Sequence, residues 1–351
     1  MAFYLGTSDQ NLKFPIKLCE LDVGNNSLHF IDSFAGSISP SYINISPDKR
    51  FLFAGSRPSG NAEGSVNSYQ INRETYDLNL INSRSSQGID PTHLSVHPLG
   101  KSLFVANYQS GTVASFQLKD NGEILPSNAN YQHKGSGPNE NRQNAAHAHY
   151  IHSDPSGNYV LSADLGADKV YIYAYDNESG KIEPNANQKY IEMAPGAGPR
   201  HLVFHPSGNW FYVINELNST LTACSFNKTR GEAKILKTIS TLPDHMVIEN
   251  FPAAIRIHPN GKFLYSSNRG HNSIALFAIH EEGIPELQET KETKGDWPRD
   301  FNIDPPGKYM IVANQRSNNL CVFAIDQENG KLKSLDIHKK TRQPTCVLFL
   351  N

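Results

Sequence analysis

The stretch Gly198-Pro-Arg-His-Leu-Val-Phe-His-Pro-Ser-Gly-Asn-Trp-Phe-Tyr-Val-Ile-Asn-Glu216 decides the fold of this chain. Apolar side chains alternate over residues 202–205, a Pro-Ser-Gly turn interrupts the run at 206–208, and a β-rich run follows at 210–214. This pattern predicts two antiparallel strands joined by a tight turn. Because antiparallel neighbours return to the same edge of a sheet, we expect Arg200 and Glu216 to meet there.

The same turn motif recurs along the chain, and its first proline repeats every 46 to 57 residues. A short strand-like run precedes each copy, a stronger run follows it, and two further runs complete the unit. Four strands in a repeat of about 50 residues are typical of a β-propeller blade. The six copies are Ser46-Pro47-Asp48-Lys49, His97-Pro98-Leu99-Gly100, Asp154-Pro155-Ser156-Gly157, His205-Pro206-Ser207-Gly208, His258-Pro259-Asn260-Gly261 and Asp304-Pro305-Pro306-Gly307.

The two ends of the chain together supply one more blade. Residues 344–351 match the first strand of the repeat, whereas residues 3–9 and 16–22 match the second and third. Joining them in one sheet closes the ring and removes the strand edges that an open array would expose. We therefore predict an all-β fold, a seven-bladed β-propeller with one blade closed by both termini, and a single domain over residues 1–351.

Bulk properties exclude several classes of protein. The formal charge of −2 and a pI near 6.7 argue against a nucleic-acid partner. No run of 18 apolar residues is present, so we expect no membrane span. The first residues lack the basic and apolar segments of a signal peptide, and the four cysteines are spaced singly. We expect a cytoplasmic protein with buried, reduced thiols, as a monomer or weak dimer.

Numbering each blade from the first proline of its turn gathers polar residues at one mouth of the central channel. The members lie six residues before that proline, or nine and ten residues after it. The mouth is therefore expected to be an arginine-rich pocket with one candidate base and one carboxylate. The residues gathered in this way are His149, Arg200 and Arg299 before the turn, and Arg57, Glu216, Asn268, Arg269 and Gln315 after it.

Several of these residues could have a structural role instead of a functional one. An Arg200–Glu216 pair also fits a structural salt bridge, because any ring of strand ends supplies some charges. His147 shares the strand face of His149 and is either a second ligand-facing group or a filler. The two histidines could bind a metal ion with a carboxylate, but no third ligand has a convincing spacing, so we predict no metal site. The histidines that open three of the turns are interpreted as turn hydrogen-bonding groups; they are His97, His205 and His258.

Two connections between blades are longer than the others. Residues 130–146 are polar and precede the strand of His149, and residues 238–252 precede the fifth complete copy of the turn motif. Both are expected to enter the rim that carries Arg200. Since long loops on a rigid scaffold are often functional, both segments are candidate lids.

The motifs together resemble the lactonase family of seven-bladed propellers, and the resemblance covers essentially the whole chain. They are Gly198-Pro-Arg-His-Leu-Val-Phe-His-Pro-Ser-Gly208 with Tyr212-Val-Ile-Asn-Glu216, His149 with Asp154-Pro-Ser-Gly157 and Ala163-Asp-Leu-Gly-Ala-Asp168, Ser267-Asn-Arg-Gly-His-Asn-Ser-Ile274, and Pro298-Arg-Asp-Phe301 with Val312-Ala-Asn-Gln315. One departure is Ala254, beside Ala253, where relatives often carry an acidic residue.

The resemblance implies that His149, Arg200, Glu216 and Arg269 form the catalytic group. It implies hydrolysis of a sugar-derived lactone, which we expect to be independent of a metal ion. The number of arginines at the rim favours a phosphorylated substrate, with 6-phosphogluconolactone of the pentose phosphate pathway as the candidate. No cofactor is expected, because the chain has no GxGxxG, P-loop or GxSxG motif. The expected partner is a small anionic sugar lactone, and the expected substrate-binding residues are Arg57, His147, Asn268, Arg299 and Gln315.

Lactone hydrolysis needs an activated water, a donor for the carbonyl oxyanion and a proton for the leaving alkoxide. His149 or Glu216 could activate the water, and the sequence leaves that choice open. Arginine forks suit an oxyanion, a carboxylate or a phosphate. Two other functions stay open, a muconate-type lactonizing cycloisomerase and a non-catalytic binding propeller, because fold does not decide function.

Overall fold

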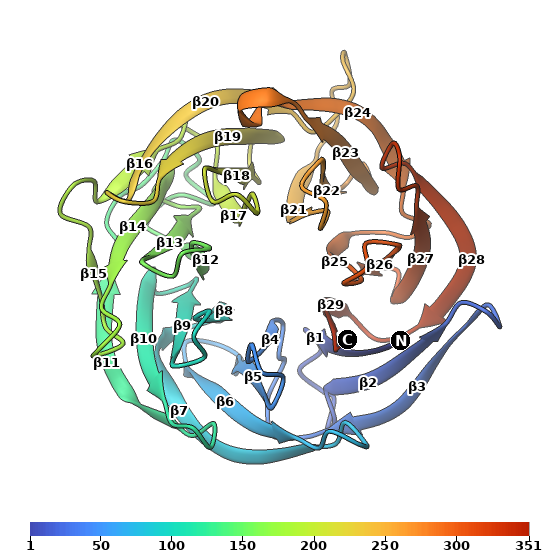
Figure 1. The fold of residues 1–351 in the computed structure, drawn as a ribbon, viewed down its shortest axis with the longest axis horizontal. Helices are drawn as coiled ribbons and strands as arrows, with labels where there is room; N and C mark the ends of the chain where they lie inside the picture. Colours follow the sequence, from blue (N-terminus) through green and yellow to red (C-terminus); the bar gives the residue numbers. More distant parts are fainter. Residues whose placement is uncertain (351) are drawn as a thin grey trace.

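The computed structural model describes residues 1–350; residue 351, the last of the predicted closing strand, lies outside the described residues. Seven antiparallel sheets stand around a central axis like the blades of a propeller (Figure 1). The sheets, each given from its innermost strand outward, begin with β29 (Pro344–Phe349), β1 (Ala2–Thr7), β2 (Ile16–Asp22) and β3 (Ser27–Phe34), then β4 (Ile43–Ile45), β5 (Phe51–Ser56), β6 (Glu63–Ile71) and β7 (Leu78–Ile89), and then β8 (Pro91–Val96), β9 (Ser102–Asn107), β10 (Thr112–Leu118) and β11 (Ile124–Gln132).

The four remaining sheets follow the same order along the chain. A short 3-10 helix, η1 (Glu281–Gly283), interrupts the sixth sheet between its two outer strands. The strands are β12 (Ala148–Ser153), β13 (Tyr159–Asp164), β14 (Lys169–Tyr175) with both β15 (Ile182–Pro184) and β16 (Tyr190–Glu192); β17 (Pro199–Phe204), β18 (Trp210–Asn215), β19 (Thr220–Asn227) and β20 (Glu232–Ser240); β21 (Phe251–Ile257), β22 (Phe263–Arg269), β23 (Ser273–Ile279) and β24 (Pro285–Glu292); and β25 (Pro298–Ile303), β26 (Tyr309–Asn314), β27 (Asn319–Ile325) and β28 (Leu332–Lys340).

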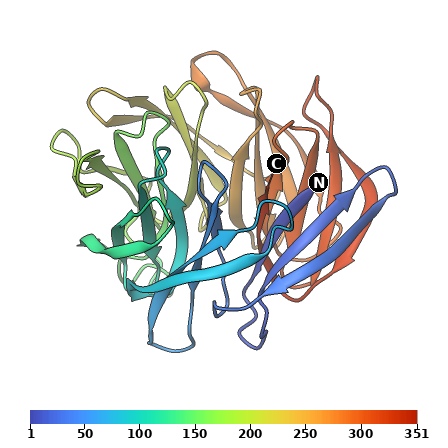
Figure 2. The same cartoon turned by 60° about the horizontal axis from the view of Figure 1, so that its bottom comes forward.

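The ring closes through the two ends of the chain. Strand β29 pairs antiparallel with β1, with Phe349 opposite Phe3 and Cys346 opposite Gly6. Figures 1 and 2 both show the two termini side by side in this blade. The predicted fold class, a seven-bladed β-propeller closed by both termini, is therefore confirmed.

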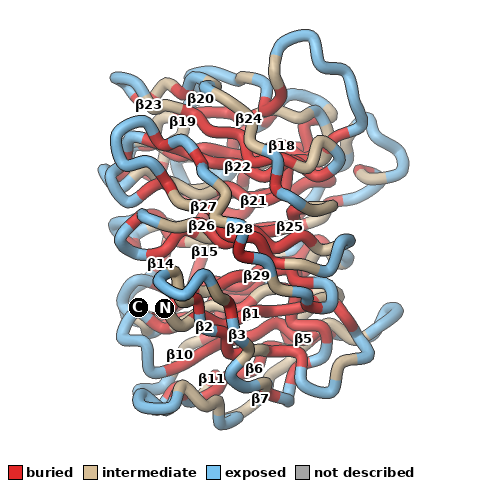
Figure 3. The backbone as a smooth tube through the Cα atoms, turned by 90° about the vertical axis from the view of Figure 1, so that its right-hand side faces the viewer, coloured by how far each residue is buried: buried red, intermediate tan, exposed pale blue. Residues whose placement is uncertain are grey.

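The core lies between neighbouring blades and not on one face of each sheet. Among the described residues, seven apolar clusters form, and each joins side chains of two adjacent blades. Leu202 and Phe204 pack toward the preceding blade, whereas Val203 packs toward the following one. Figure 3 shows the consequence, with buried strands stacked through the body and exposed loops at its margins. Successive side chains of an inner strand therefore pack alternately against the preceding and the following blade, because both faces of the strand are covered.

One rim carries the Pro-Gly turns and is called the turn rim. The last residue of the turn is left-handed, with φ of +71° at Gly208 and +74° at Gly261, and glycine adopts this conformation without steric cost. The turn histidines also join neighbouring blades, as predicted for turn hydrogen-bonding groups. Nε2 of His97 lies 2.8 Å from the carbonyl oxygen of Gly157, and Nε2 of His258 lies 2.8 Å from that of Gly307.

The opposite rim, here called the arginine rim, receives both long connections. Their predicted bounds were wrong at the start, because β11 extends to Gln132 and β20 to Ser240. The outer strands thus continue into both segments before the chain leaves the sheet. The loops proper span residues 133–147 and 241–250. No helix among residues 1–350 is long and apolar enough to cross a membrane.

Candidate active site

A β-bulge recurs near the start of the inner strands at the arginine rim. In β12 the pairing skips from Ala148 to Tyr150, and in β17 it skips from Pro199 to His201. A bulge of this kind turns the extra side chain away from the regular alternation. The skipped residues stand at the register position that the sequence analysis assigned to His149, Arg200 and Arg299. They are Thr92, His149, Arg200, Arg299 and Thr345, with Ala253 inside a longer skip in β21.

Four of these residues, Thr92, His149, Arg200 and Arg299, line a cavity of about 290 Å³ at the mouth of the channel. That volume is at the small end of the range for ligand pockets and suits a sugar-sized molecule. Six of the nine predicted site residues line it. The lining residues are Arg57, Asp90, Thr92, Tyr108, Arg142, His149, Arg200, Glu216, Arg269 and Arg299.

Glu216 lies at the centre of a group of arginines. Its Oε2 is 2.9 Å from Nε of Arg200 and 2.7 Å from Nη2 of Arg269, and its Oε1 accepts a hydrogen bond of 2.6 Å from Nη2 of Arg142. Burial alone would raise the pKa of Glu216, but the positive charges of Arg269, Arg200 and Arg142 outweigh it and lower the pKa to about 2. Glu216 is therefore a permanent anion whose two oxygens are both occupied.

His149, unlike Glu216, is uncharged and forms few polar contacts. It is 5% exposed, and its buried Nδ1 has no hydrogen-bond partner among the described residues. Burial lowers the pKa of His149 well below its usual value, and the nearby charges of Arg200, Arg299 and Arg269 lower it further. The imidazole is therefore neutral at pH 7 and keeps a lone pair available for a proton.

Positive charge exceeds negative charge in the cavity. Five arginines and two carboxylates line it, so its net charge is +3 with His149 neutral. Asp90 pairs with Arg57, which also donates a hydrogen bond of 2.8 Å to Oγ of Ser41. Burial, with Arg269 and Arg57 close by, lowers the pKa of Arg299 to about 10. This crowding of cations favours an anionic ligand.

A second, smaller space lies next to the cavity. Its volume of about 10 Å³ is enough for roughly one water molecule. His149, Arg200 and Arg299 line both spaces, and Nη1 of Arg200 lies 3.2 Å from Nε2 of His201. His201 and Thr345 also border this space, and within residues 1–350 the buried Nδ1 of His201 and Oγ1 of Thr345 have no hydrogen-bond partner. The inner end of the site is therefore polar, small and closed by imidazole and hydroxyl groups.

The sequence of this chain matches, over residues 2–349, the family described as Lactonase, 7-bladed beta-propeller. The chain belongs to this family. A 6-phosphogluconolactonase of Bacillus subtilis is 33% identical over 99% of this chain and 98% of its own length.

Two solved structures share the whole fold with this member of the lactonase family. The periplasmic gluconolactonase of Pseudomonas aeruginosa superposes with a TM-score of 0.92 at 28% identity, covering 100% of this chain and 99% of its own. A protein from Lactobacillus plantarum has a TM-score of 0.92 at 30% identity and full coverage of both chains. The lactonase fold and the ring of blades are thus shared at full length.

Three predicted substrate contacts do not line the cavity of this lactonase-family chain. His147 stacks on Tyr108, with ring centroids 4.7 Å apart, and its Nδ1 lies 3.0 Å from the carbonyl oxygen of Tyr108. Asn268 is fully buried and donates a hydrogen bond of 2.9 Å to the carbonyl oxygen of Thr241. Gln315 donates one of 2.7 Å to Oγ of Ser8. These side chains hold neighbouring loops in place.

Four lining residues of the cavity were absent from the predicted site. Tyr108 and Thr92 stand at the register positions and could have been included, since both can donate a hydrogen bond. Asp90 and Arg142 belong to connections outside the repeat, and no periodic signal marks them. Arg142 comes from the loop of residues 133–147, which was predicted as a lid. The second predicted lid, residues 238–252, contributes no residue to the cavity.

The donor set of the cavity suits anions and not cations. Within residues 1–350, no three His, Cys, Asp or Glu side chains gather closely enough to hold a metal ion. Ala254, the departure from the family pattern, is fully buried in an apolar cluster with Phe301. The four cysteines are buried and unpaired, as predicted.

Proposed function

We propose that this protein hydrolyses a sugar-derived lactone, with 6-phosphogluconolactone as the substrate, without a metal ion. The observation that carries the proposal is a neutral His149, whose Nδ1 has no hydrogen-bond partner within residues 1–350, at a cavity of net charge +3. Membership of the lactonase family supports the reaction, and the name of the Bacillus subtilis relative supports the phosphorylated substrate. A role in the pentose phosphate pathway and a cytoplasmic location belong to the same proposal.

In the proposed reaction, the imidazole of His149 takes a proton from a water molecule as the water oxygen bonds to the lactone carbonyl carbon. General base catalysis of this kind contributes about 10²- to 10⁴-fold. The carbonyl oxygen becomes an oxyanion, which Arg200 and Arg269 stabilise. The ring carbon–oxygen bond then breaks, and the leaving alkoxide takes the proton from His149. The product is the open-chain acid, which ionises.

Glu216 has a positioning role in this mechanism. Both of its oxygens are within ion-pair distance of guanidinium groups, and its pKa near 2 makes it a weak base. Arg200 is further fixed by a hydrogen bond of 2.5 Å to the carbonyl oxygen of Ala253, and Arg269 by one of 2.9 Å to that of Phe251. Glu216 thus holds two donor forks in place before substrate arrives.

Substrate charge strengthens the proposed base. The arginines lower the pKa of His149 because they disfavour its protonated form. The negative charge of a substrate bound in the cavity offsets part of their field, so it raises the pKa of His149 toward its usual value. A general base is most effective when its pKa is near the working pH. An anionic lactone therefore strengthens the base that activates the attacking water.

An assay of the purified protein against a panel of lactones tests the proposal. The panel contains 6-phosphoglucono-δ-lactone, glucono-δ-lactone, a γ-lactone and a carboxymuconate, each with and without a chelator. We expect the highest kcat/KM for the phosphorylated sugar lactone and no change on chelation. Turnover of the carboxymuconate alone would identify a cycloisomerase, and turnover of none would favour a binding protein.

A further inference from the structure

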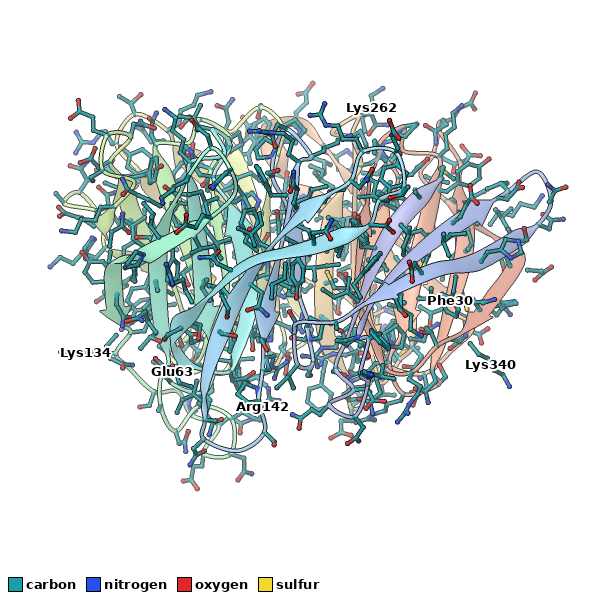
Figure 4. All side chains as sticks on the ribbon, turned by 90° about the horizontal axis from the view of Figure 1, so that it is seen from below. Phe30, Glu63, Lys134, Arg142, Lys262 and Lys340 are labelled. Carbon is teal, nitrogen blue, oxygen red and sulfur yellow. The ribbon has the colours of Figure 1, made fainter. Side chains whose placement is uncertain are left out.

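Arg142 differs from the other four arginines of the cavity in its origin and its exposure. It comes from the loop of residues 133–147, whereas the others stand on or directly after strands. Its side chain is 36% exposed, compared with 3% for Arg200 and 6% for Arg269. Figure 4 shows Arg142 at the rim opposite Lys262, which follows a Pro-Gly turn. Arg142 therefore forms the outer end of the cavity.

The loop is built to hold Arg142 in place. The neighbouring Gln143 is fully buried, and its Nε2 donates hydrogen bonds of 2.9 Å to the carbonyl oxygen of Leu165 and 2.7 Å to Oδ1 of Asp168. The backbone amides of Arg142 and Gln143 donate to the carbonyl oxygen of Asn139, at 3.0 and 2.7 Å. Since these contacts fix the backbone, little conformational entropy is left for a ligand to remove.

The same carboxylate that holds the loop also holds the entry to β17. Asp168 accepts hydrogen bonds of 2.7 Å from the backbone amides of Gly196 and Gly198. Gly198 lies two residues before Arg200, and its φ of +63° is the left-handed conformation. Asp168 therefore fixes Arg142, at the outer end of the site, relative to Arg200, at its inner end.

Arg142 is the most exposed of the three guanidinium groups that pair with Glu216. It shares Glu216 with Arg200 and Arg269, so one carboxylate faces three cations. Its second contact is the hydroxyl of Tyr108, at 3.3 Å, which carries no charge. A guanidinium with exposed donors and surplus positive charge suits the planar, bidentate recognition of a phosphate.

We propose that Arg142 determines specificity for the phosphoryl group of a phosphorylated sugar lactone. The inference rests on the proposed function. The lactone carbonyl must reach His149 and Arg200, which also border the small inner space, so the far end of the sugar lies toward the mouth. The phosphoryl group there meets the exposed donors of Arg142. Gln143 is a positioning residue for this contact.

The test compares two substrates in the Arg142→Gln variant. We expect kcat/KM for 6-phosphoglucono-δ-lactone to fall about 10- to 100-fold more than kcat/KM for glucono-δ-lactone, the loss expected for a charge-assisted hydrogen bond. The inhibition constant of inorganic phosphate should rise in parallel. Gln143→Leu should change the ratio in the same direction by a smaller factor. The matched control is Arg73→Gln, at an exposed arginine in the turn between β6 and β7, which should leave both substrates unaffected.

Equal losses on both lactones, or none on either, would overturn the assignment of Arg142. If the unmodified protein hydrolyses no lactone, the proposed function fails, and equilibrium binding of inorganic phosphate then tests Arg142 separately. Weaker phosphate binding by Arg142→Gln, with Arg73→Gln unchanged, would support the anion contact. Unchanged binding in both variants would contradict it. Circular dichroism and thermal melting show whether each variant folds.

Discussion

The His149→Asn variant is expected to fold normally and to lose about 10²- to 10⁴-fold in kcat on the best sugar lactone. Asparagine keeps a polar side chain at the bulge but has no nitrogen that can take a proton from water at neutral pH. KM should change much less than kcat, because the arginines that bind the anion stay in place. Steady-state kinetics measure both constants, and thermal melting reports the fold.

The control for this variant is His29→Asn, at an exposed histidine of the outer strand β3, which should keep full activity. Glu216→Gln provides the second comparison. Since Glu216 positions arginines in our account, its variant should lose less kcat than His149→Asn. A kcat of His149→Asn within threefold of the unmodified protein, or a larger loss in Glu216→Gln, would contradict the assignment of His149 as the base.

Deletion of residues 344–351 is expected to abolish the stable monomeric fold. It removes β29, the inner strand of the closing blade, and exposes the edge of β1. Val347 and Phe349 leave one apolar cluster, and Cys346 and Leu350 leave another. Burial of a large apolar side chain contributes about 1.5–3 kcal/mol, so the loss approaches the whole stability of a typical domain, about 5–15 kcal/mol. Size-exclusion chromatography and thermal melting measure the outcome.

A synthetic peptide of residues 344–351 supplies the control for the deletion. Added to the truncated protein, it should restore part of the melting transition, because the vacant position beside β1 is the one that it occupies in the intact chain. A truncated protein that stays monomeric with an unchanged melting temperature would show that the closing strand is dispensable.

The architecture could be predicted because the same four-strand pattern occurs several times along the sequence. The Pro-Gly turn fixes the register of each blade, and the matching ends of the chain indicate closure. Packing could not be predicted to the same degree. The alternation of Leu202 and Val203 reads as one buried and one exposed face, yet both residues pack against neighbouring blades. Both faces of these strands carry apolar side chains because a neighbouring blade covers each face, and this becomes clear only when the whole ring is known.

The candidate site could be predicted in part, and the repeat explains where the prediction overreached. Asparagine recurs nine residues after the proline in four blades. Asn268 and Asn314 donate to carbonyl oxygens of the connection before their blade, and Asn107 donates to the carbonyl oxygen of Ser86 in β7. Asparagines at this recurring register position therefore have structural tasks. The next position varies among blades, and it supplies Arg57, Tyr108, Glu216 and Arg269 to the cavity.

Two features of the site could not be read from the sequence. The bulges at His149 and Arg200 depend on how each inner strand pairs with the next, and the residue pattern does not reveal the skipped pair. Arg142 reaches Glu216 only because Gln143 and Asp168, 25 residues apart, meet in the folded chain. Such contacts between a loop and a turn leave no periodic signal.

The most direct test of the central claim is a crystal structure of the protein soaked with 6-phosphogluconate, the product of the proposed reaction. We predict that the product occupies the cavity at the arginine rim, with its carboxylate near His149 and Arg200 and its phosphate against Arg142. If the product bound in the reverse orientation, the cavity would still be the binding site, but Arg142 would not recognise the phosphate. Product bound only at the turn rim, with the arginine-rim cavity empty, would contradict the account.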